Sequence, residues 1–409
     1  MKVLQINCEY KTGSTGKIAD CIAQGLKQCG HEVFTCYGLH KHSDDGESAC
    51  ICTSIEHKIN ALISRIDGIP YGGYFWANRR FKNIVLSFNP DIVHVHCING
   101  YTINIYNLLK FLAKRNIKTV VTLHAEFFFT GGCSHSYDCN QWLTGCKKCD
   151  VYRKTVSSWF FDRAEASWKK MYMAFSAFNP KNIRIIAVSP WLENRAKKSA
   201  ILRPFNVSCI GNGVDTDVFK FYPNEKEKDV LDETNDRKCI LFVTAHFSMN
   251  ESDSKGGKYL VELAKLTPEY KYIVVARSSD IIKSKLPHNV YYIGCTDNQS
   301  ELAYLYSSAD VSITLGKRET FSMIVAESLC CGTPIIGFQA GGPESIGMRE
   351  FSEFVSYGNV KLLHEALEKM LRKNINKYEL SINAAKVYGK NVMFENYANI
   401  YNELKLGEL

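Results

Sequence analysis

Short apolar runs rich in β-branched residues alternate with longer helical patterns along nearly the whole chain. In the first half, the predicted strands are Lys2–Asn7, Glu32–Tyr37, Asp91–His96, Ile117–Leu123 and Arg184–Val188. Helices are predicted from about Lys17 to Gly30 and from Pro190 to about Ser199. Buried strands separated by helices are typical of a parallel sheet in an α/β protein.

A second alternating series follows a polar stretch at residues 212–237, which contains a charge run at 224–229 and is interpreted as a connection between domains. The strands predicted after it are Cys239–Thr244, Tyr272–Ala276, Val290–Gly294, Val311–Leu315 and Pro334–Phe338. The helices predicted among them include Gly257–Leu266, Glu301–Ser308 and Phe321–Cys330. The tail Tyr378–Leu409 is predicted to be helical, with Met393, Tyr397, Ile400 and Leu404 on one face.

The simplest organisation is two Rossmann-like domains joined by a linker. We expect residues 1–217 to form the first domain, with a cysteine-rich insertion at 131–150, and residues 218–388 to form the second. Residues 389–409 are expected to cross back to the first domain as a helix. Ligands of such sheets bind beyond the carboxyl ends of the strands, so a cleft between the domains is the expected site.

Composition narrows the class of protein. Hydrophobic residues make up 45% and charged residues 22% of the 409 residues, which excludes a long disordered protein. The formal charge of +8 is small for this length and suits anionic small molecules or a membrane surface at least as well as nucleic acid. No nucleic acid is expected among the partners. Because the chain shows no run of 18 apolar residues and no secretory signal, we expect a cytoplasmic protein whose 16 cysteines are reduced.

Two turns have the character of anion sites. Gly13–Lys17 joins the first strand to the first helix, and its glycines, Gly16 included, allow a ligand to approach the helix start; an ordinary tight turn is equally consistent. The segment lacks the three-glycine fingerprint of a dinucleotide dehydrogenase. In the second turn, Glu319 precedes a helix start and Glu327 lies inside the helix. The free N–H groups there would face a bound diphosphate, although two acids eight residues apart are by themselves no more than a solvated helix.

The surroundings of that second turn resemble the GT-B glycosyltransferases, and specifically the large retaining family four that includes bacterial capsule and exopolysaccharide transferases. The residues that carry the resemblance are Glu319, Glu327, Gly332-Thr-Pro334, Gly341-Gly342-Pro343-Glu344, Leu302–Asp310, Asn212-Gly213-Val214-Asp215 and Lys255-Gly256. The resemblance covers essentially the whole chain. It implies an α/β GT-B fold, in which an acceptor-side domain and a nucleotide-sugar-binding domain face each other across a cleft.

The resemblance also implies roles for single residues. Glu327 would hold the donor ribose, Glu319 would contact the transferred sugar, and Lys255 would contact the diphosphate. The backbone of Thr320, Phe321, Ser322 and Met323 would meet the diphosphate, and the turn at Cys295 would meet the base. We expect no catalytic metal, because Lys255 and two helix starts can balance the diphosphate charge. A UDP-sugar is favoured over a GDP-sugar as the donor.

One departure from the family pattern is a missing arginine after the first strand of the second domain, for which His246 or Arg277 could compensate. In the first domain, the resemblance places His124 near the reaction centre. Relatives commonly have His-Asp at that point, whereas here Ala125 and Glu126 follow, so no catalytic role is assigned to Glu126. His94 and His96 alternate with valines in a strand and are interpreted as structural.

The implied reaction is front-face transfer with retention, in which the leaving diphosphate takes the proton from the incoming hydroxyl. The acceptor is expected to be a glycan, and the resemblance favours a lipid-linked one. Two other hypotheses stay open at this point. One is a nucleotide-sugar epimerase of similar fold, and the other is a binding protein that has lost its chemistry.

Four cysteines, Cys133, Cys139, Cys146 and Cys149, fall within one loop-like segment of low apolar content. Four thiolates satisfy tetrahedral zinc, and a structural zinc ion would order such a loop. His135 is a substitute ligand, and free or redox-active thiols are the alternative.

Aromatic and basic residues alternate in Tyr71–Lys82, including Tyr74, Phe75, Trp76, Arg79 and Arg80. Such a segment suits the inner face of the plasma membrane, where basic residues meet anionic lipid. The alternative is an ordinary helix whose aromatic residues pack in the core.

Overall fold

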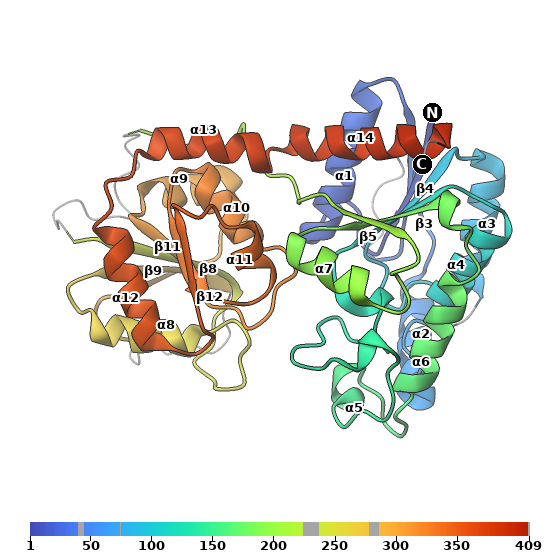
Figure 1. Cartoon of the computed structure of the whole chain (residues 1–409), viewed down its shortest axis with the longest axis horizontal. Helices are drawn as coiled ribbons and strands as arrows, with labels where there is room; N and C mark the ends of the chain where they lie inside the picture. Colours follow the sequence, from blue (N-terminus) through green and yellow to red (C-terminus); the bar gives the residue numbers. More distant parts are fainter. Residues whose placement is uncertain (40–44, 74, 224–236, 278–285, 408–409) are drawn as a thin grey trace. The chain divides into compact units, whose positions relative to one another are not determined.

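The computed structural model describes residues 1–39, 45–73, 75–223, 237–277 and 286–407. The chain forms two compact units (Figure 1). One consists of Met1–Gly211 together with Met393–Leu409, and the other of Asn212–Val392. The boundary lies a few residues before the expected one, and the charge run at 224–229 lies outside the described residues.

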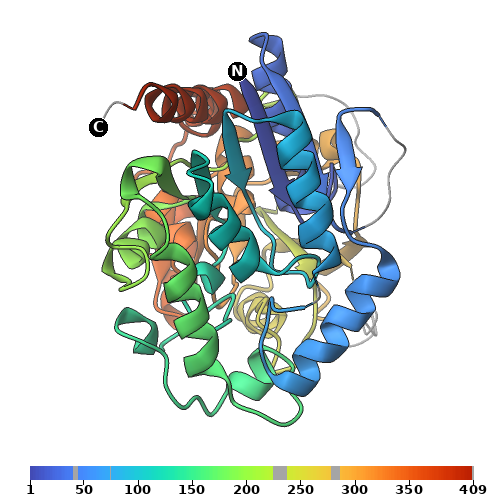
Figure 2. The ribbon, with the colours of Figure 1, turned by 90° about the vertical axis from the view of Figure 1, so that its right-hand side faces the viewer.

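The first unit is built on a seven-stranded parallel sheet with the order β3-β2-β1-β4-β5-β6-β7. The strands are β1 (Lys2–Asn7), β2 (Glu32–Tyr37), β3 (Ser48–Cys50), β4 (Ile92–Val95), β5 (Thr119–Leu123), β6 (Ile183–Ala187) and β7 (Asn206–Cys209). The helices are α1 (Gly13–Gln28), α2 (Ser54–Asp67), α3 (Trp76–Phe88), α4 (Ile105–Lys114), α5 (Tyr152–Thr155), α6 (Ala164–Phe175) and α7 (Pro190–Lys198), with 3₁₀ turns at Glu126–Phe128, Gln141–Leu143 and Pro180–Asn182. Figure 2 shows this unit from the front.

The second unit has a six-stranded parallel sheet with the order β10-β9-β8-β11-β12-β13. Its strands are β8 (Cys239–His246), β9 (Lys271–Arg277), β10 (Val290–Gly294), β11 (Val311–Thr314), β12 (Ile335–Phe338) and β13 (Ser352–Val355). The helices are α8 (Gly257–Leu266), α9 (Gln299–Ser308), α10 (Met323–Cys330), α11 (Gly342–Ile346), α12 (Val360–Leu371), α13 (Lys377–Tyr388) and α14 (Lys390–Leu406), the last of which continues into the first unit.

Both sheets have the doubly wound order, in which strands are added first on one side of the first strand and then on its other side. The change of side falls between β1 and β4 in one sheet and between β8 and β11 in the other. Open sheets of this order bind ligands beyond the carboxyl ends of the strands at that switch point. The expected Rossmann-like character of both halves is therefore confirmed.

Three strands had no counterpart in the sequence prediction: β3, β7 and β13. Each has only three or four residues and forms an edge of its sheet. Edge strands are short and partly polar, so they carry no continuous apolar run.

The prediction of one continuous C-terminal helix was wrong, because the tail forms two helices that meet at Gly389. The Val214 N–H donates to the Tyr388 carbonyl at 2.7 Å, and the Lys390 N–H donates to the Val214 carbonyl at 2.8 Å. The Lys390 ammonium also lies 2.7 Å from the Asp215 carboxylate. Val214 and Asp215 thus bind the end of α13 and the start of α14 at the break between them.

From Met393 onward, α14 packs within the core of the first unit (Figures 1 and 2). Met393, Tyr397, Tyr401 and Leu404 are buried in one cluster with residues of α1 and of the central strands. Ile400, expected on the same face, is only partly buried.

Candidate functional site

The switch point of the second sheet brings Lys255 and Glu319 together. Lys255 lies between β8 and α8, and Glu319 follows β11, the neighbouring strand. The Lys255 ammonium is 3.0 Å from the Glu319 carboxylate. The two loops are joined directly, because the Lys317 N–H donates to the Ser254 carbonyl at 2.8 Å. Next to Lys255, a side chain at Gly256 would stand 2.4 Å from the Leu315 carbonyl oxygen, so glycine is required for the loops to meet.

The Glu319 turn is held from its other side by the Gly341–Glu344 segment. The Glu319 N–H donates to the Ala340 carbonyl at 3.0 Å, and the Gly342 N–H donates to the Glu319 carbonyl at 2.8 Å. A side chain at Gly342 would lie only 2.5 Å from the Thr320 carbonyl carbon. The Glu344 carboxylate accepts from the Gly341 N–H at 2.8 Å. The glycine pair and the acid that carried the family resemblance therefore position Glu319.

Ser322 precedes α10 in a conformation that side chains rarely adopt. Its φ is 88°, and its buried hydroxyl has no hydrogen-bond partner among the described residues. A strained backbone costs about 1–3 kcal/mol and is typical of functional turns. The helix begins at Met323, two residues later than predicted, so the free N–H groups belong to the turn and to the first residues of α10.

Glu327 is the fifth residue of α10 and is half-buried. The buried hydroxyl of Tyr306, from α9, donates to the Glu327 carboxylate at 3.4 Å. Burial, followed by the nearby Glu327 charge, raises the pKa of Tyr306 well above its ordinary value, so this hydroxyl stays protonated and can donate.

The remaining predicted residues of this unit lie further along the same sheet edge. Cys295 is exposed just after β10, three strand positions from β11. His246 and Arg277 face each other at the ends of β8 and β9, and the Arg277 guanidinium is 3.5 Å from the exposed Asp297 carboxylate. Both side chains are exposed at the carboxyl ends of these strands.

In the first unit, His124 follows β5 and contacts a buried histidine. The His96 Nδ1 is 3.4 Å from the His124 Nε2, and the His96 Nε2 is 3.1 Å from the amide oxygen of Gln5 on β1. His94 stacks on His96 with ring centroids 3.7 Å apart. Burial lowers the pKa of His124 to about 4 and the pKa of His94 and His96 well below 6.5, so all three imidazoles are neutral near pH 7.

These contacts suit one ordered arrangement of the imidazole protons. With the Gln5 amide oxygen toward it, neutral His96 carries its proton on Nε2 and its Nδ1 accepts. The His124 Nε2 then donates to His96. Exchanging the two ends of the Gln5 amide, whose nitrogen has no partner among the described residues, would reverse this order. His96, interpreted from the sequence as structural, is thus also in contact with His124.

Gly16 does not mark a helix start, as the sequence suggested, because α1 begins at Gly13. Gly16 lies inside the first turn, where a side chain would come 3.3 Å from the Glu9 carbonyl oxygen. The free N–H groups of this helix therefore belong to Gly13 and its immediate neighbours.

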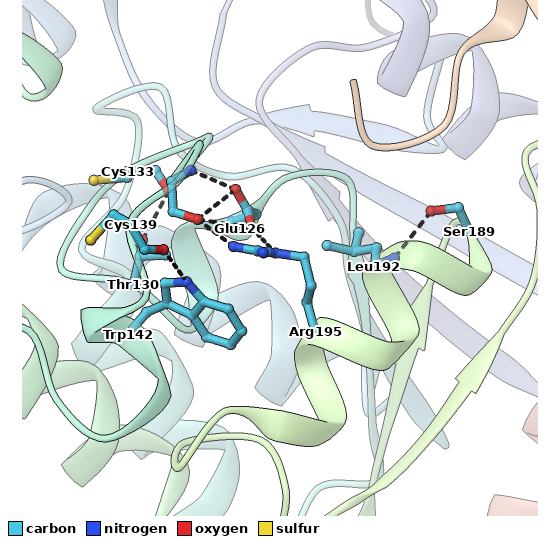
Figure 3. A network of polar contacts seen from close by, with 9 residues as sticks. Glu126, Thr130, Cys133, Cys139, Trp142, Ser189, Leu192 and Arg195 are labelled. Carbon is cyan, nitrogen blue, oxygen red and sulfur yellow. Dashed lines mark hydrogen bonds and ion pairs between the residues drawn. The ribbon is translucent and has the colours of Figure 1, made fainter. Parts of the chain in front are cut away.

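Glu126, which the sequence left without a role, is fully buried in a charged network (Figure 3). Its carboxylate accepts from the Arg195 guanidinium at 2.5 Å and from the Ser136 N–H at 2.5 Å. The guanidinium packs 4.3 Å from the Trp142 ring. A buried carboxylate needs such partners, and this one ties the loop after His124 to α7.

The surface predicted on Tyr71–Lys82 is largely structural. Tyr71 and Phe81 are buried, and Tyr74 lies outside the described residues. The Arg80 guanidinium pairs with Glu56 and donates to the Ile51 carbonyl at 2.8 Å. Among the residues of this segment that the structure describes, only Phe75, Trp76 and Arg79 are exposed, so an ordinary helix packed on the core accounts for most of it.

Two family models match the chain. Glycosyltransferase Family 4 matches residues 16–218, and Glycosyl transferases group 1 matches residues 224–387. The chain belongs to the family-four glycosyltransferases of GT-B fold. The expected enzyme class is thereby confirmed.

Individual relatives of this glycosyltransferase agree over the full length. An Escherichia coli K12 protein named as the colanic acid biosynthesis glycosyl transferase WcaC is 21% identical over 99% of this chain and 100% of its own. Sucrose-phosphate synthase from Thermosynechococcus elongatus shares the fold with a TM-score of 0.71, 14% identity and full coverage of both chains. Anabaena HepE in complex with UDP gives a TM-score of 0.65 at 15% identity, covering 98% of this chain and 100% of its own.

Proposed function

We propose that this glycosyltransferase moves a sugar from a UDP-sugar to a lipid-linked glycan acceptor, with retention of configuration, in the synthesis of a surface polysaccharide. The Escherichia coli relative is named for colanic acid biosynthesis, which supports a polysaccharide product. HepE, of the same fold, was solved with UDP, which supports a uridine nucleotide.

The observation that carries the donor site is the Lys255–Glu319 pair at the switch point of the second sheet. A cation, a carboxylate and a strained turn with a partnerless buried hydroxyl, Ser322, meet where such sheets bind nucleotides. A bound diphosphate would replace Glu319 as the ion-pair partner of Lys255. Glu319 would then be available to hydroxyl groups of the transferred sugar.

In the proposed reaction, the N–H groups from Thr320 to Met323 hold the diphosphate and Glu327 holds the ribose hydroxyls. As the bond from the anomeric carbon to the diphosphate breaks, the acceptor oxygen bonds to the same face of that carbon. The acceptor proton passes to the departing diphosphate oxygen. Neutral His124 would orient a hydroxyl group of the transferred sugar. No step calls for a metal ion.

The acceptor proposal places the enzyme at the cytoplasmic face of a membrane. Among the described residues, no helix combines the length and apolarity needed to cross a bilayer. A lipid-linked acceptor would therefore be reached by contact with the membrane surface.

A panel of nucleotide sugars, screened for thermal stabilisation, tests the donor, because a ligand of the folded state raises the melting temperature. We expect a UDP-sugar to stabilise the enzyme most. Glu327→Ala should weaken UDP binding by about 1–3 kcal/mol in calorimetry, because ribose hydroxyls lose their partner. Glu365→Ala, an exposed acid on α12, is the matched control. Equal UDP affinity in wild type and Glu327→Ala would refute the ribose assignment, and stabilisation by no nucleotide sugar would refute the donor site.

A further inference from the structure

The four cysteines of the loop after β5 surround one small cavity. Cys133, Cys139, Cys146 and Cys149 all line it, together with Trp142 and Tyr152. The cavity has a volume of about 20 Å³, which is room for one water-sized body. In Figure 3 the sulfur atoms of Cys133 and Cys139 lie on the same side of the Glu126 network. Cysteines from different parts of a 17-residue segment thus line the same cavity.

The convergence is not a disulfide cluster. All sixteen cysteines are free, so no disulfide joins the four. The loop has two 3₁₀ turns but no strand between Leu123 and Tyr152. Phe127, Phe128 and Phe129 are buried at its start, whereas in residues 133–151 only Ser136 and Trp142 are buried. Cys146 and Cys149 pack on a small cluster of Tyr152, Val156 and Ala164. A segment of this length with so few buried side chains is one that a bound ion would order.

We propose that Cys133, Cys139, Cys146 and Cys149 bind one structural zinc ion. Four thiolates form a closed tetrahedral site, and reduced cysteines in a cytoplasmic protein favour metal over disulfides. On binding, the thiols release their protons to solvent as the four sulfur–zinc bonds form. His135, the substitute ligand considered from sequence, is not among the residues that line the cavity.

Binding requires a local rearrangement of the side chains. Within the described part of the chain, no three His, Cys, Asp or Glu side chains stand in a geometry that could hold a metal ion. Each cysteine has a single side-chain torsion with three staggered wells, so its sulfur can turn toward the cavity while the backbone stays nearby. Zinc binding would therefore draw the four sulfur atoms closer together around a cavity that the fold already provides.

The ion would act on the loop that begins at His124. Ser136, which lies between Cys133 and Cys139, donates to Glu126, and Glu126 pairs with Arg195 of α7. The Trp142 indole N–H donates to the Cys139 carbonyl at 2.7 Å, and the Trp142 ring packs on Arg195. Zinc would thus fasten the same network that anchors the chain just after His124. It would have no part in the transfer, since four protein ligands leave no open position.

Metal analysis of protein purified without added metal tests this proposal independently of the sugar reaction. We expect about one zinc per chain. Cys146→Ser should lower the zinc affinity at least about tenfold, whereas Cys29→Ser, at an exposed cysteine after α1, should not change it. Cobalt added to the metal-free enzyme should give the visible absorption of a tetrahedral tetrathiolate site.

Wild-type protein gives a second measurement if Cys146→Ser fails to fold. The four thiols should resist alkylation until a chelator is added, and chelation should speed hydrogen exchange at residues 126–150 while leaving residues 239–392 unchanged. Metal-free protein with four readily alkylated thiols would overturn the proposal, as would mass spectrometry showing disulfides among the four cysteines. Loss of donor binding with zinc still present would instead count against the proposed function alone.

Discussion

At the scale of single residues, the contact between His96 and His124 decides which atom of His124 can accept a hydrogen bond. Gln5→Met keeps the size of the side chain but removes the oxygen that fixes the His96 proton on Nε2. We expect ¹⁵N NMR of histidine-labelled protein to show one tautomer of His124, protonated on Nε2, in the wild type and a mixture in Gln5→Met. Thr122→Val is the matched control, because Thr122 contacts His94 and not His96. If the His124 tautomer were unchanged in Gln5→Met, Gln5 would not set the position of the proton on His124.

The same cluster predicts acid sensitivity. His94, His96 and His124 have pKa values lowered by burial, and that of His124 falls to about 4. The unfolded chain, with histidine pKa values near 6.5, therefore binds more protons than the folded chain below that pH. Stability should be fully present above about pH 6.5 and should fall as the pH drops toward 4. Melting temperatures measured across this range test the slope, which His124→Asn should flatten.

Sequence reasoning found the residues whose chemistry is visible in their type and spacing. Lys255 and Glu319 are 64 positions apart, yet the motif order predicted both, and the structure places them 3.0 Å apart. Glu126 was missed because its meaning depends on Arg195, a partner in another element. The strain at Ser322 was missed because a backbone angle set by tertiary contacts has no signature in one sequence.

At the scale of elements, the short connection after α10 requires a glycine at position 332. Its φ is 77°, and a side chain there would stand 2.3 Å from the Lys377 carbonyl oxygen at the start of α13. Gly30, after α1, has a similar φ of 75° but nothing within 4 Å of the added carbon. Both Gly→Ala changes carry the left-handed penalty of about 1 kcal/mol, and only Gly332→Ala adds a backbone collision.

We therefore expect Gly332→Ala to lower the free energy of unfolding by at least about 2 kcal/mol more than Gly30→Ala does. Urea denaturation, followed at both units, measures the difference. Equal losses would show that α13 can move away from Gly332 without cost, and the Gly-Thr-Pro motif would then need another explanation. The break between α13 and α14 at Gly389 could not be predicted from the sequence, because it depends on hydrogen bonds from Val214 to both helix ends.

At the scale of the whole molecule, a second group of exposed aromatic residues lies outside the segment that the sequence suggested. Trp159, Phe160 and Phe161 are consecutive and are 46%, 63% and 46% exposed. The Trp159 N–H donates to the Arg65 carbonyl at 2.7 Å, and the Arg163 guanidinium lies 4.8 Å from the centre of the Phe161 ring. Arg153 donates to the Trp159 carbonyl. The backbone of Arg65 and the side chains of Arg153 and Arg163 thus contact this segment, and all three arginines are exposed.

Substitutions in residues 159–161 therefore test membrane contact more cleanly than a charge reversal at Arg80, which would also break the ion pair with Glu56. Aromatic side chains favour the bilayer interface, and each basic residue near an anionic leaflet contributes about 1 kcal/mol. The double change Trp159→Ser and Phe160→Ser should therefore weaken co-sedimentation with phosphatidylserine vesicles, and high salt should release the wild type by screening its basic residues. Tyr378→Ser, at a 64% exposed ring in the second unit, should bind vesicles as the wild type does. UDP affinity should be unchanged in all of these proteins, because none of the altered residues belongs to the loops that carry Lys255 and Glu319. If the double variant sediments like the wild type, the membrane contact is not made through this segment. If the co-sedimentation of the wild type depends neither on vesicle charge nor on salt, a soluble acceptor is the better proposal.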